Sequence, residues 1–216
     1  MWRPWLDAAL VLLWAPTCAA CGAPLDAPSY GCVCASCWRE VATARDQPAP
    51  SEGLRTVAIG SHDGALRQVV HALKYDGRRS LAGPLGALLR QRAHTVLADA
   101  DVAVPVPLHP ARLRARGFNQ AAALAAHLGL RVVPALRRCR HTRAQAELAA
   151  QARHDNVRRA FVATRRARAV EGRVVVVVDD VYTTGATVEA CAAVLREAGA
   201  RDIRVVTATR AAPSRA

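Results

Sequence analysis

The sequence predicts an α/β protein in which a parallel β-sheet is flanked by helices, preceded by a small cysteine-rich region. From residue 54 on, short apolar segments alternate with helical patterns, the order that right-handed β–α–β crossovers produce. The five valines at 174–178 lack the polar alternation of a half-exposed strand, so they indicate a central strand covered on both faces. Two C-x-x-C pairs, at 18–21 and 34–37, set the first part of the chain apart.

The first segment, MWRPWLDAALVLLWAPTC, predicts an amphipathic helix that docks on the rest of the protein. Its apolar face would consist of Trp5, Leu6, Ala9, Leu10 and Leu13. A signal peptide is a weaker interpretation, because Asp7 interrupts the apolar run and no A-x-A cleavage site follows. The run is also far too short to span a bilayer. We therefore expect a cytoplasmic protein without a membrane span.

The cysteines of the two C-x-x-C pairs, Cys18, Cys21, Cys34 and Cys37, are candidate ligands of a zinc ion. Four thiolates would complete a tetrahedral site, so the metal would be structural rather than catalytic. Cys32 is an alternative ligand to Cys34, although the C-x-x-C spacing favours Cys34. Free thiols or disulfides are the other interpretations, and a cytoplasmic location weighs against disulfides.

Residues 44–53 (ARDQPAPSEG) have the polar, proline-rich composition of a linker. We therefore predict an N-terminal helix and zinc-ribbon-like region over residues 1–43, this linker, and a larger domain over residues 54–212.

Within the larger domain, apolar runs bounded by turn residues predict strands over 54–60, 101–106, 131–134, 173–178 and 203–209. Apolar residues at helical spacing predict helices over 65–75, 81–97, 119–128 and 187–198, the last closed by Gly199. Residues 143–153 are polar but helical in composition. In open parallel sheets, ligands bind beyond the carboxyl ends of the strands, which is where Asp179 and Asp180 follow the valine run.

The formal net charge of +13 suggests anionic partners such as phosphorylated metabolites or nucleic acid. That inference is weak, because the arginine-rich, alanine-rich and valine-rich composition is also typical of a GC-rich genome. Among the 30 basic residues only Lys74 is a lysine, which runs against this bias and marks it as a candidate site residue.

The stretch VVVVVDDVYTTGAT (174–187) carries the most specific chemistry in the chain. The carboxylates of Asp179 and Asp180 could accept hydrogen bonds from the 2′- and 3′-hydroxyls of a ribose, or ligate Mg²⁺. Backbone N–H groups, threonine hydroxyls and the start of the following helix could hold a 5′-phosphate, with Gly185 allowing close approach. The alternative is a polar turn with Thr187 as a helix cap. The order of acidic pair, threonines and glycine favours a ribose 5-phosphate site.

This stretch resembles the PRPP-binding motif of type I phosphoribosyltransferases, and the chain as a whole resembles the ComF-like proteins. The segments HDGALRQVVHALKYDG (62–77), DVAVPVPLHPARLRARGFNQA (101–121), and the later Arg143, Arg153 and Phe161 fall in that family's order. The family usually has an aromatic residue at the position of His62.

The resemblance implies a type I phosphoribosyltransferase fold that binds PRPP with Mg²⁺. The implied PRPP-binding residues are Asp179, Asp180, Val181, Tyr182, Thr183, Thr184, Gly185, Ala186 and Thr187, and Asp179 and Asp180 are the candidate catalytic residues. The loop after residue 106 would face the pyrophosphate, with His109, Arg112, Arg114, Arg116 and Asn119 as candidates, joined by Lys74 and Tyr75. For each single arginine, a solvated basic loop is an equal alternative.

Two functions remain open. The first is an enzyme that transfers phosphoribosyl from PRPP to an unidentified acceptor and releases pyrophosphate. The second is a nucleotide sensor or accessory factor of the DNA-uptake machinery, in which Trp38 and the basic charge contact single-stranded DNA. We expect any DNA binding to be weak, because only 4% of the residues are aromatic.

Overall fold

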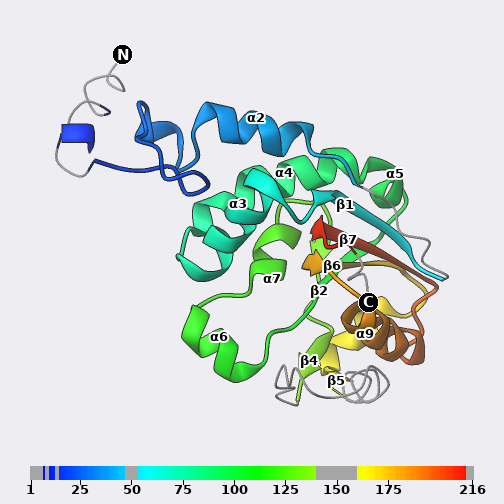
Figure 1. Cartoon of the computed structure of the whole chain (residues 1–216). Helices are drawn as coiled ribbons and strands as arrows, with labels where there is room; N and C mark the ends of the chain where they lie inside the picture. Colours follow the sequence, from blue (N-terminus) through cyan, green and yellow to red (C-terminus); the bar gives the residue numbers. More distant parts are fainter. Residues whose placement is uncertain (1–6, 8–9, 13–14, 47–52, 140–159, 213–216) are drawn as a thin grey trace.

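One parallel sheet forms the centre of the molecule (Figure 1). The computed structural model describes residues 7, 10–12, 15–46, 53–139 and 160–212. In this part of the chain the sheet has the strand order β1-β7-β6-β2-β3, and all neighbouring strands are parallel. The strands are Arg55–Ser61 (β1), Val102–Pro105 (β2), Arg131–Val132 (β3), Val174–Tyr182 (β6) and Asp202–Arg210 (β7). The predicted fold class is confirmed.

Helices lie on both faces of this sheet (Figure 1). The α-helices are Ala35–Thr43 (α2), Gly64–Tyr75 (α3), Ala82–Arg92 (α4), His94–Leu97 (α5), Pro110–Arg116 (α6), Gln120–Ala125 (α7) and Ala186–Glu197 (α9). Short 3₁₀ helices cover Pro28–Tyr30 (η1), Arg79–Leu81 (η2) and Arg165–Val170 (η3), and a small antiparallel pair joins Leu136–Arg138 (β4) to Phe161–Ala163 (β5).

The valines of β6 divide between two hydrophobic cores, because successive side chains of a strand point to opposite faces. Val176 and Val178 belong to the core that holds the buried faces of α3, α4 and α7. Val175 and Val177 belong to the core beneath α9 and η3. Burial on both faces explains why this strand carries no polar alternation.

Strand β6 is longer than the sequence indicated. It was expected to end at Val178, but it continues through both aspartates to Tyr182. Pairing with β7 maintains the strand there, with Asp179 opposite Thr207 and Tyr182 opposite Arg210. The other neighbour, β2, ends where Pro105 lies opposite Val178. The aspartates therefore lie on the last part of a strand, beside the point where its neighbour stops.

Three further elements differ from the expectation. The predicted helix over 81–97 is broken at Ala93, and the short α5 that follows brings Val96 and Leu97 into the core. The loop after residue 106 contains α6, and the β4–β5 pair was not expected. Proline at the start of α6 and Gly117 after its end (φ 75°) are ordinary helix-boundary signals that could have predicted it.

The cysteine-rich region packs on the larger domain. Its buried residues Cys18, Leu25, Cys37 and Val41 belong to the same core as the apolar faces of α3 and α4. The predicted boundary at 44–53 lies partly outside the described residues, and the division into parts stays a prediction. Most of the predicted N-terminal helix, and the helical segment at 143–153, also lie outside the described residues. None of the helices in the described ranges is both long and apolar enough to cross a membrane.

Candidate functional site

Asp179 and Asp180 point to opposite faces of the sheet. They continue the alternation of the valines before them, so Asp180 faces the α3 and α7 side and Asp179 faces the α9 side. Because β2 stops at Pro105, the edge of β6 next to the aspartates has no strand partner from β2. The two carboxylates thus flank a short stretch of backbone at the carboxyl end of the central strand.

Asp180 is held by donors from two helices. Lys74 Nζ, on the last turn of α3, lies 2.8 Å from Asp180 Oδ1. Gln120 Nε2, on the first turn of α7, donates to Asp180 Oδ2. Asp180 is 6% exposed and Gln120 is 4% exposed. The only lysine of the chain therefore pairs with the acidic motif, a contact that the sequence did not predict. Its contact with a ligand stays a prediction.

Asp179 lies in a different electrostatic setting. Burial, followed by the neighbouring charge of Asp180, raises the pKa of Asp179 to about 7, against smaller opposing effects of Lys74 and Arg138. Its Oδ1 accepts a hydrogen bond from the backbone N–H of Asp180 at 2.9 Å. A carboxylate with a raised pKa at the carboxyl end of a central strand is a candidate for a functional group.

The turn after the strand leads directly into α9. Thr183 and Thr184 are exposed, and Gly185 adopts a left-handed conformation (φ 80°) immediately before the helix. The side chain of Tyr182 lies against this glycine, so that a Cβ at position 185 would meet Tyr182 Oη at 2.5 Å. Helix α9 begins one residue earlier than expected, at Ala186, and its first N–H groups have no intrahelical acceptors. The N–H of Ala186 donates to Thr184 Oγ1 at 3.5 Å. The exposed hydroxyls and the N–H groups at this helix start could donate to an anion.

The predicted pyrophosphate-side residues divide into two groups. His109 and Asn119 are helix caps: His109 Nδ1 accepts from Ala111 N at 3.2 Å, and Asn119 Oδ1 accepts from Ala121 N at 2.9 Å. Arg112 and Arg114 are exposed on α6, which has no buried residue and lies at the periphery of the molecule (Figure 1). Their contact with a ligand stays a prediction.

Arg116 is the arginine of α6 that contacts the helix carrying Lys74. Its guanidinium carbon lies 4.9 Å from the centre of the Tyr75 ring, and Tyr75 follows Lys74 at the end of α3. The cation–π contact brings the last turn of α6 next to the last turn of α3. Arg116 thus contacts Tyr75, the residue after Lys74 in the chain, whereas the Lys74 side chain turns to Asp180. No contact among the described residues links Arg112 or Arg114 to either of them.

Two residues near the acidic pair were not predicted as site residues. Gln120 contacts Asp180 directly, and Arg138 on β4 interacts electrostatically with Asp179. Gln120 lies within the quoted RGFNQ segment, but a glutamine at a helix start carries no distinctive signal. Arg138 is one of many arginines and lies on a strand that the sequence did not predict.

The four cysteines predicted as metal ligands do lie together. The sulfur atoms of Cys18, Cys21, Cys34 and Cys37 all lie within 4.8 Å of one another, and Cys21 Sγ is 3.8 Å from Cys34 Sγ. A tetrahedral site with Zn–S bonds of about 2.3 Å needs sulfur separations of about 3.8 Å. A hydrogen bond with the Ser36 hydroxyl is the main cause that lowers the pKa of Cys34 to about 6. The lowered pKa favours the thiolate form, which is the form that binds a metal. These four residues could hold a metal ion such as zinc.

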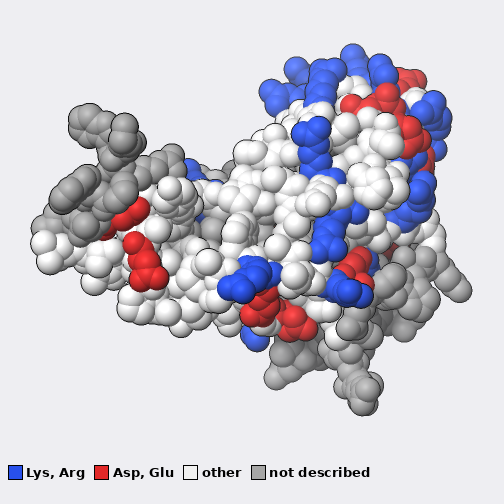
Figure 2. All heavy atoms as spheres, turned by 90° about the horizontal axis from the view of Figure 1, so that it is seen from above, with Lys and Arg blue, Asp and Glu red and all other residues white. Residues whose placement is uncertain are grey.

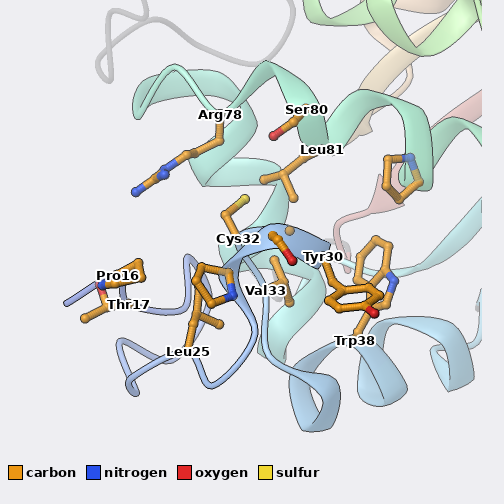
Figure 3. Close-up of a pocket in the computed structure, with 14 residues that line it drawn as sticks. Pro16, Thr17, Leu25, Tyr30, Cys32, Val33, Trp38, Arg78, Ser80 and Leu81 are labelled. Carbon is orange, nitrogen blue, oxygen red and sulfur yellow. The ribbon is translucent and has the colours of Figure 1, made fainter. Parts of the chain in front are cut away.

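Cys32 belongs to a different feature, a cavity of about 510 Å³ between the cysteine-rich region and the start of α4 (Figure 3). Its walls include Tyr30 and Trp38 on one side and Ser80 and Leu81 on the other. Because Cys32 lines this cavity and lies outside the group of four sulfurs, the geometry favours Cys34 over Cys32 as the ligand.

Known proteins resemble this chain over most of its length. The phosphoribosyl transferase domain family matches residues 113–215, which include both aspartates and the turn before α9. The DNA utilization protein YhgH of Salmonella typhi is 34% identical over 198 residues, covering 87% of this chain and 81% of that protein. Competence protein F of Haemophilus influenzae is 31% identical over 206 residues, covering 91% of this chain and 85% of that protein. The chain belongs to the ComF-like family.

The ComF-like assignment confirms the resemblance found in the sequence, and the fold is that of a phosphoribosyltransferase-type domain. Among solved structures, the glutamine phosphoribosylpyrophosphate (PRPP) amidotransferase from B. subtilis matches at 28% identity and a TM-score of 0.41, over 60% of this chain and 26% of that one. A likeness at this TM-score adds nothing to the family assignment.

Proposed function

We propose that this ComF-like protein binds PRPP, or a ribonucleoside 5′-phosphate, through residues 179–187 and transfers the phosphoribosyl group to an acceptor. One observation carries the proposal. Two carboxylates on the last part of β6 are followed within a few residues by exposed hydroxyls and the first N–H groups of α9. That spacing suits a ribose whose hydroxyls meet the carboxylates and whose 5′-phosphate meets the turn.

In the proposed reaction, a nucleophile attacks C1′ of the ribose, and the bond from C1′ to the pyrophosphate oxygen breaks. Pyrophosphate leaves with the bonding electron pair, and the acceptor gives up a proton as its new bond forms. We assign no covalent step to the motif residues, so the chain would act by positioning and by electrostatic stabilisation of the positive charge at C1′. Asp179 and Asp180 supply negative charge on that side of the sugar.

The divalent ion fits this donor set. Asp179 and Asp180 offer carboxylate oxygens, the ligand type that Mg²⁺ prefers, and a nearby cation would favour the ionised form of the half-buried Asp179, whose pKa is raised. Bound with PRPP, Mg²⁺ would neutralise part of the diphosphate charge. Lys74 and Arg116 are the proposed residues on the pyrophosphate side, because both carry positive charge that would attract a diphosphate.

We also propose that the four-cysteine site holds a structural Zn²⁺. All four ligand positions of a tetrahedral ion would be filled by the chain, which leaves none for a substrate. Its role would be to fix the turns of the cysteine-rich region on the core that it shares with α3 and α4.

A second function rests on the relatives, whose names refer to DNA utilization and competence. In this second function the protein would be a sensor that binds the same ribose phosphates without turnover, or an accessory factor that contacts single-stranded DNA. On the face shown in Figure 2, most basic side chains gather in the upper right part of the view, with acidic side chains beside them, and the rest of the visible face carries few charges. The acidic side chains beside this basic cluster would weaken its attraction for phosphates, so we propose weak, salt-sensitive DNA binding there.

Two assays separate these functions. Purified protein is incubated with PRPP, Mg²⁺ and a panel of purine, pyrimidine and amine acceptors while pyrophosphate is followed. Transfer predicts acceptor-dependent pyrophosphate release that is lost in Asp179→Asn with Asp180→Asn. If PRPP binds and no acceptor releases pyrophosphate, the enzyme proposal is wrong and the sensor remains. A salt titration of a labelled single-stranded oligonucleotide, with Trp38→Ala as the variant, tests the DNA role.

A further inference from the structure

Gln120 occupies a fixed position beside the acidic pair. It is the first residue of α7, and Asn119 caps that helix through Ala121 N. The other end of the Asn119 amide, Nδ2, donates to the carbonyl of Val106 at 3.0 Å, one residue after β2 ends. Because β2 pairs with β6, this contact fixes the start of α7 next to the strand that carries Asp180.

The hydrogen bond to the Asp180 carboxylate orients the side-chain amide of Gln120. Its Nε2 donates to Asp180 Oδ2, so its Oε1 points elsewhere. That Oε1 is buried and has no hydrogen-bond partner among the described residues. Among the described residues, the side-chain amide of Gln120 therefore makes its hydrogen bond to Asp180 and no other.

A bound phosphate would affect the two donors to Asp180, Lys74 and Gln120, in different ways. Lys74 carries a charge on a long, flexible side chain that is 16% exposed, and Tyr75, the next residue in the chain, contacts Arg116. An incoming diphosphate attracts that ammonium and competes with Asp180 for it. Gln120 is neutral and enclosed by the protein, so a phosphate does not draw it away.

We propose that Gln120 is a positioning residue that keeps the Asp180 carboxylate oriented toward the ribose hydroxyls when Lys74 turns to the phosphates. This inference rests on the proposed function and adds a specificity role to it. The carboxylate accepts from Gln120 through one oxygen and keeps its remaining lone pairs for sugar hydroxyls. Without the amide donor, Asp180 loses its fixed rotation, and the site loses its ability to distinguish ribose from a deoxy sugar.

The test compares ribose 5-phosphate with its 2-deoxy and 3-deoxy forms by calorimetry, using the full-length protein. We expect the wild type to prefer ribose 5-phosphate over at least one deoxy form by about tenfold, the scale of one hydrogen bond to a charged group. In Gln120→Met, this preference should fall to within about twofold, with the affinity for that deoxy sugar nearly unchanged. Gln68→Met, the same substitution at an exposed position of α3, is the matched control and should keep the wild-type preference.

A merely structural role predicts something different, namely that Gln120→Met weakens all sugar phosphates equally. Equal weakening, or an unchanged preference in a folded variant, would overturn the inference while leaving ribose-phosphate binding intact. Gln120→Asn, whose shorter amide does not reach Asp180, keeps a polar group in the pocket and provides a second variant if the methionine variant does not fold. Wild-type protein that binds none of these sugars would overturn the proposed function together with the inference.

Discussion

At the scale of single residues, the two adjacent aspartates have unlike environments although they are chemically identical. Asp180 is paired with a lysine and an amide, whereas Asp179 is half-buried and has a raised pKa. The alternation of the strand causes this difference, because it directs the two side chains to opposite faces of the sheet. A carboxylate that is more easily protonated in the folded chain than in the unfolded one lowers stability when it is ionised.

This gives a prediction for Asp179→Asn. Between the ordinary pKa of 3.8 and the folded value of about 7, the folded protein keeps a proton that the unfolded chain releases, so the contribution of Asp179 to stability falls as pH rises. The free energy of unfolding of the variant should equal that of the wild type near pH 4 and exceed it by about 2 kcal/mol above pH 7. One pKa unit corresponds to about 1.4 kcal/mol, and the partial solvation of Asp179 reduces the total. Urea unfolding at a series of pH values measures this. A constant difference across the series would contradict the assignment.

For single residues, the sequence predicted some members of the candidate site and missed others. The acidic pair, the glycine turn and Lys74 were identified as candidates from composition and residue order. Gln120 and Arg138 were not, because their roles depend on contacts between segments far apart in the chain: Gln120 is 60 residues from Asp180.

At the scale of elements, the sequence predicted the sheet and its main helices because their apolar patterns are long and regular. The valine run, α3 and α9 appear within one or a few residues of the expected bounds, apart from the C-terminal end of β6. That end was misplaced because pairing with β7 extends the strand through polar residues, an effect of the neighbouring strand rather than of the local sequence. The β4–β5 pair has only three residues in each strand, too few to show a period.

Helix α3 connects the cysteine-rich region to the acidic pair. Its own N-cap residue, Asp63, makes no side-chain capping hydrogen bond, and Glu40 of α2 supplies the acceptor instead: Glu40 Oε1 accepts from Ala65 N at 2.7 Å. Lys74 lies at the other end of the same helix. Glu40, from the cysteine-rich region, therefore caps α3, the helix that carries the candidate site residue Lys74.

We predict that Glu40→Ala lowers the free energy of unfolding by about 1 kcal/mol, the usual effect of losing a helix cap. Glu40→Gln keeps an acceptor oxygen at the same place and should retain most of that stability. Thermal unfolding of the two variants beside the wild type measures the difference. If both variants unfold at the wild-type temperature, the contact does not stabilise α3.

At the scale of the whole molecule, the cysteine-rich region and the sheet share one hydrophobic core, to which Cys37 and Val41 contribute alongside Leu66 and Leu73. The polar composition of residues 44–53 predicted a linker between two parts. Composition does not show which apolar faces meet, so the shared core could not be predicted. Shared burial means that loss of order in the cysteine-rich region exposes apolar surface of α3 and α4.

Metal removal tests this coupling. Protein purified without chelator should contain about one equivalent of zinc per chain. A strong chelator should lower the temperature of a single unfolding transition, because the region held by the metal completes the shared core. Two separate transitions, with only the smaller one shifted, would show that the region folds independently. A control with Cys139→Ser, outside the four-sulfur group, should respond to the chelator as the wild type does.

The most direct test of ribose-phosphate binding is calorimetric titration of PRPP with Mg²⁺ into the wild type and into Asp179→Asn with Asp180→Asn. Asparagine preserves the shape of each side chain and removes both charges, so circular dichroism should show an unchanged fold. We predict saturable binding to the wild type and at least a hundredfold loss in the double variant, which corresponds to about 2.7 kcal/mol. Equal affinity for PRPP in a folded double variant would contradict the assignment of the site to residues 179–187.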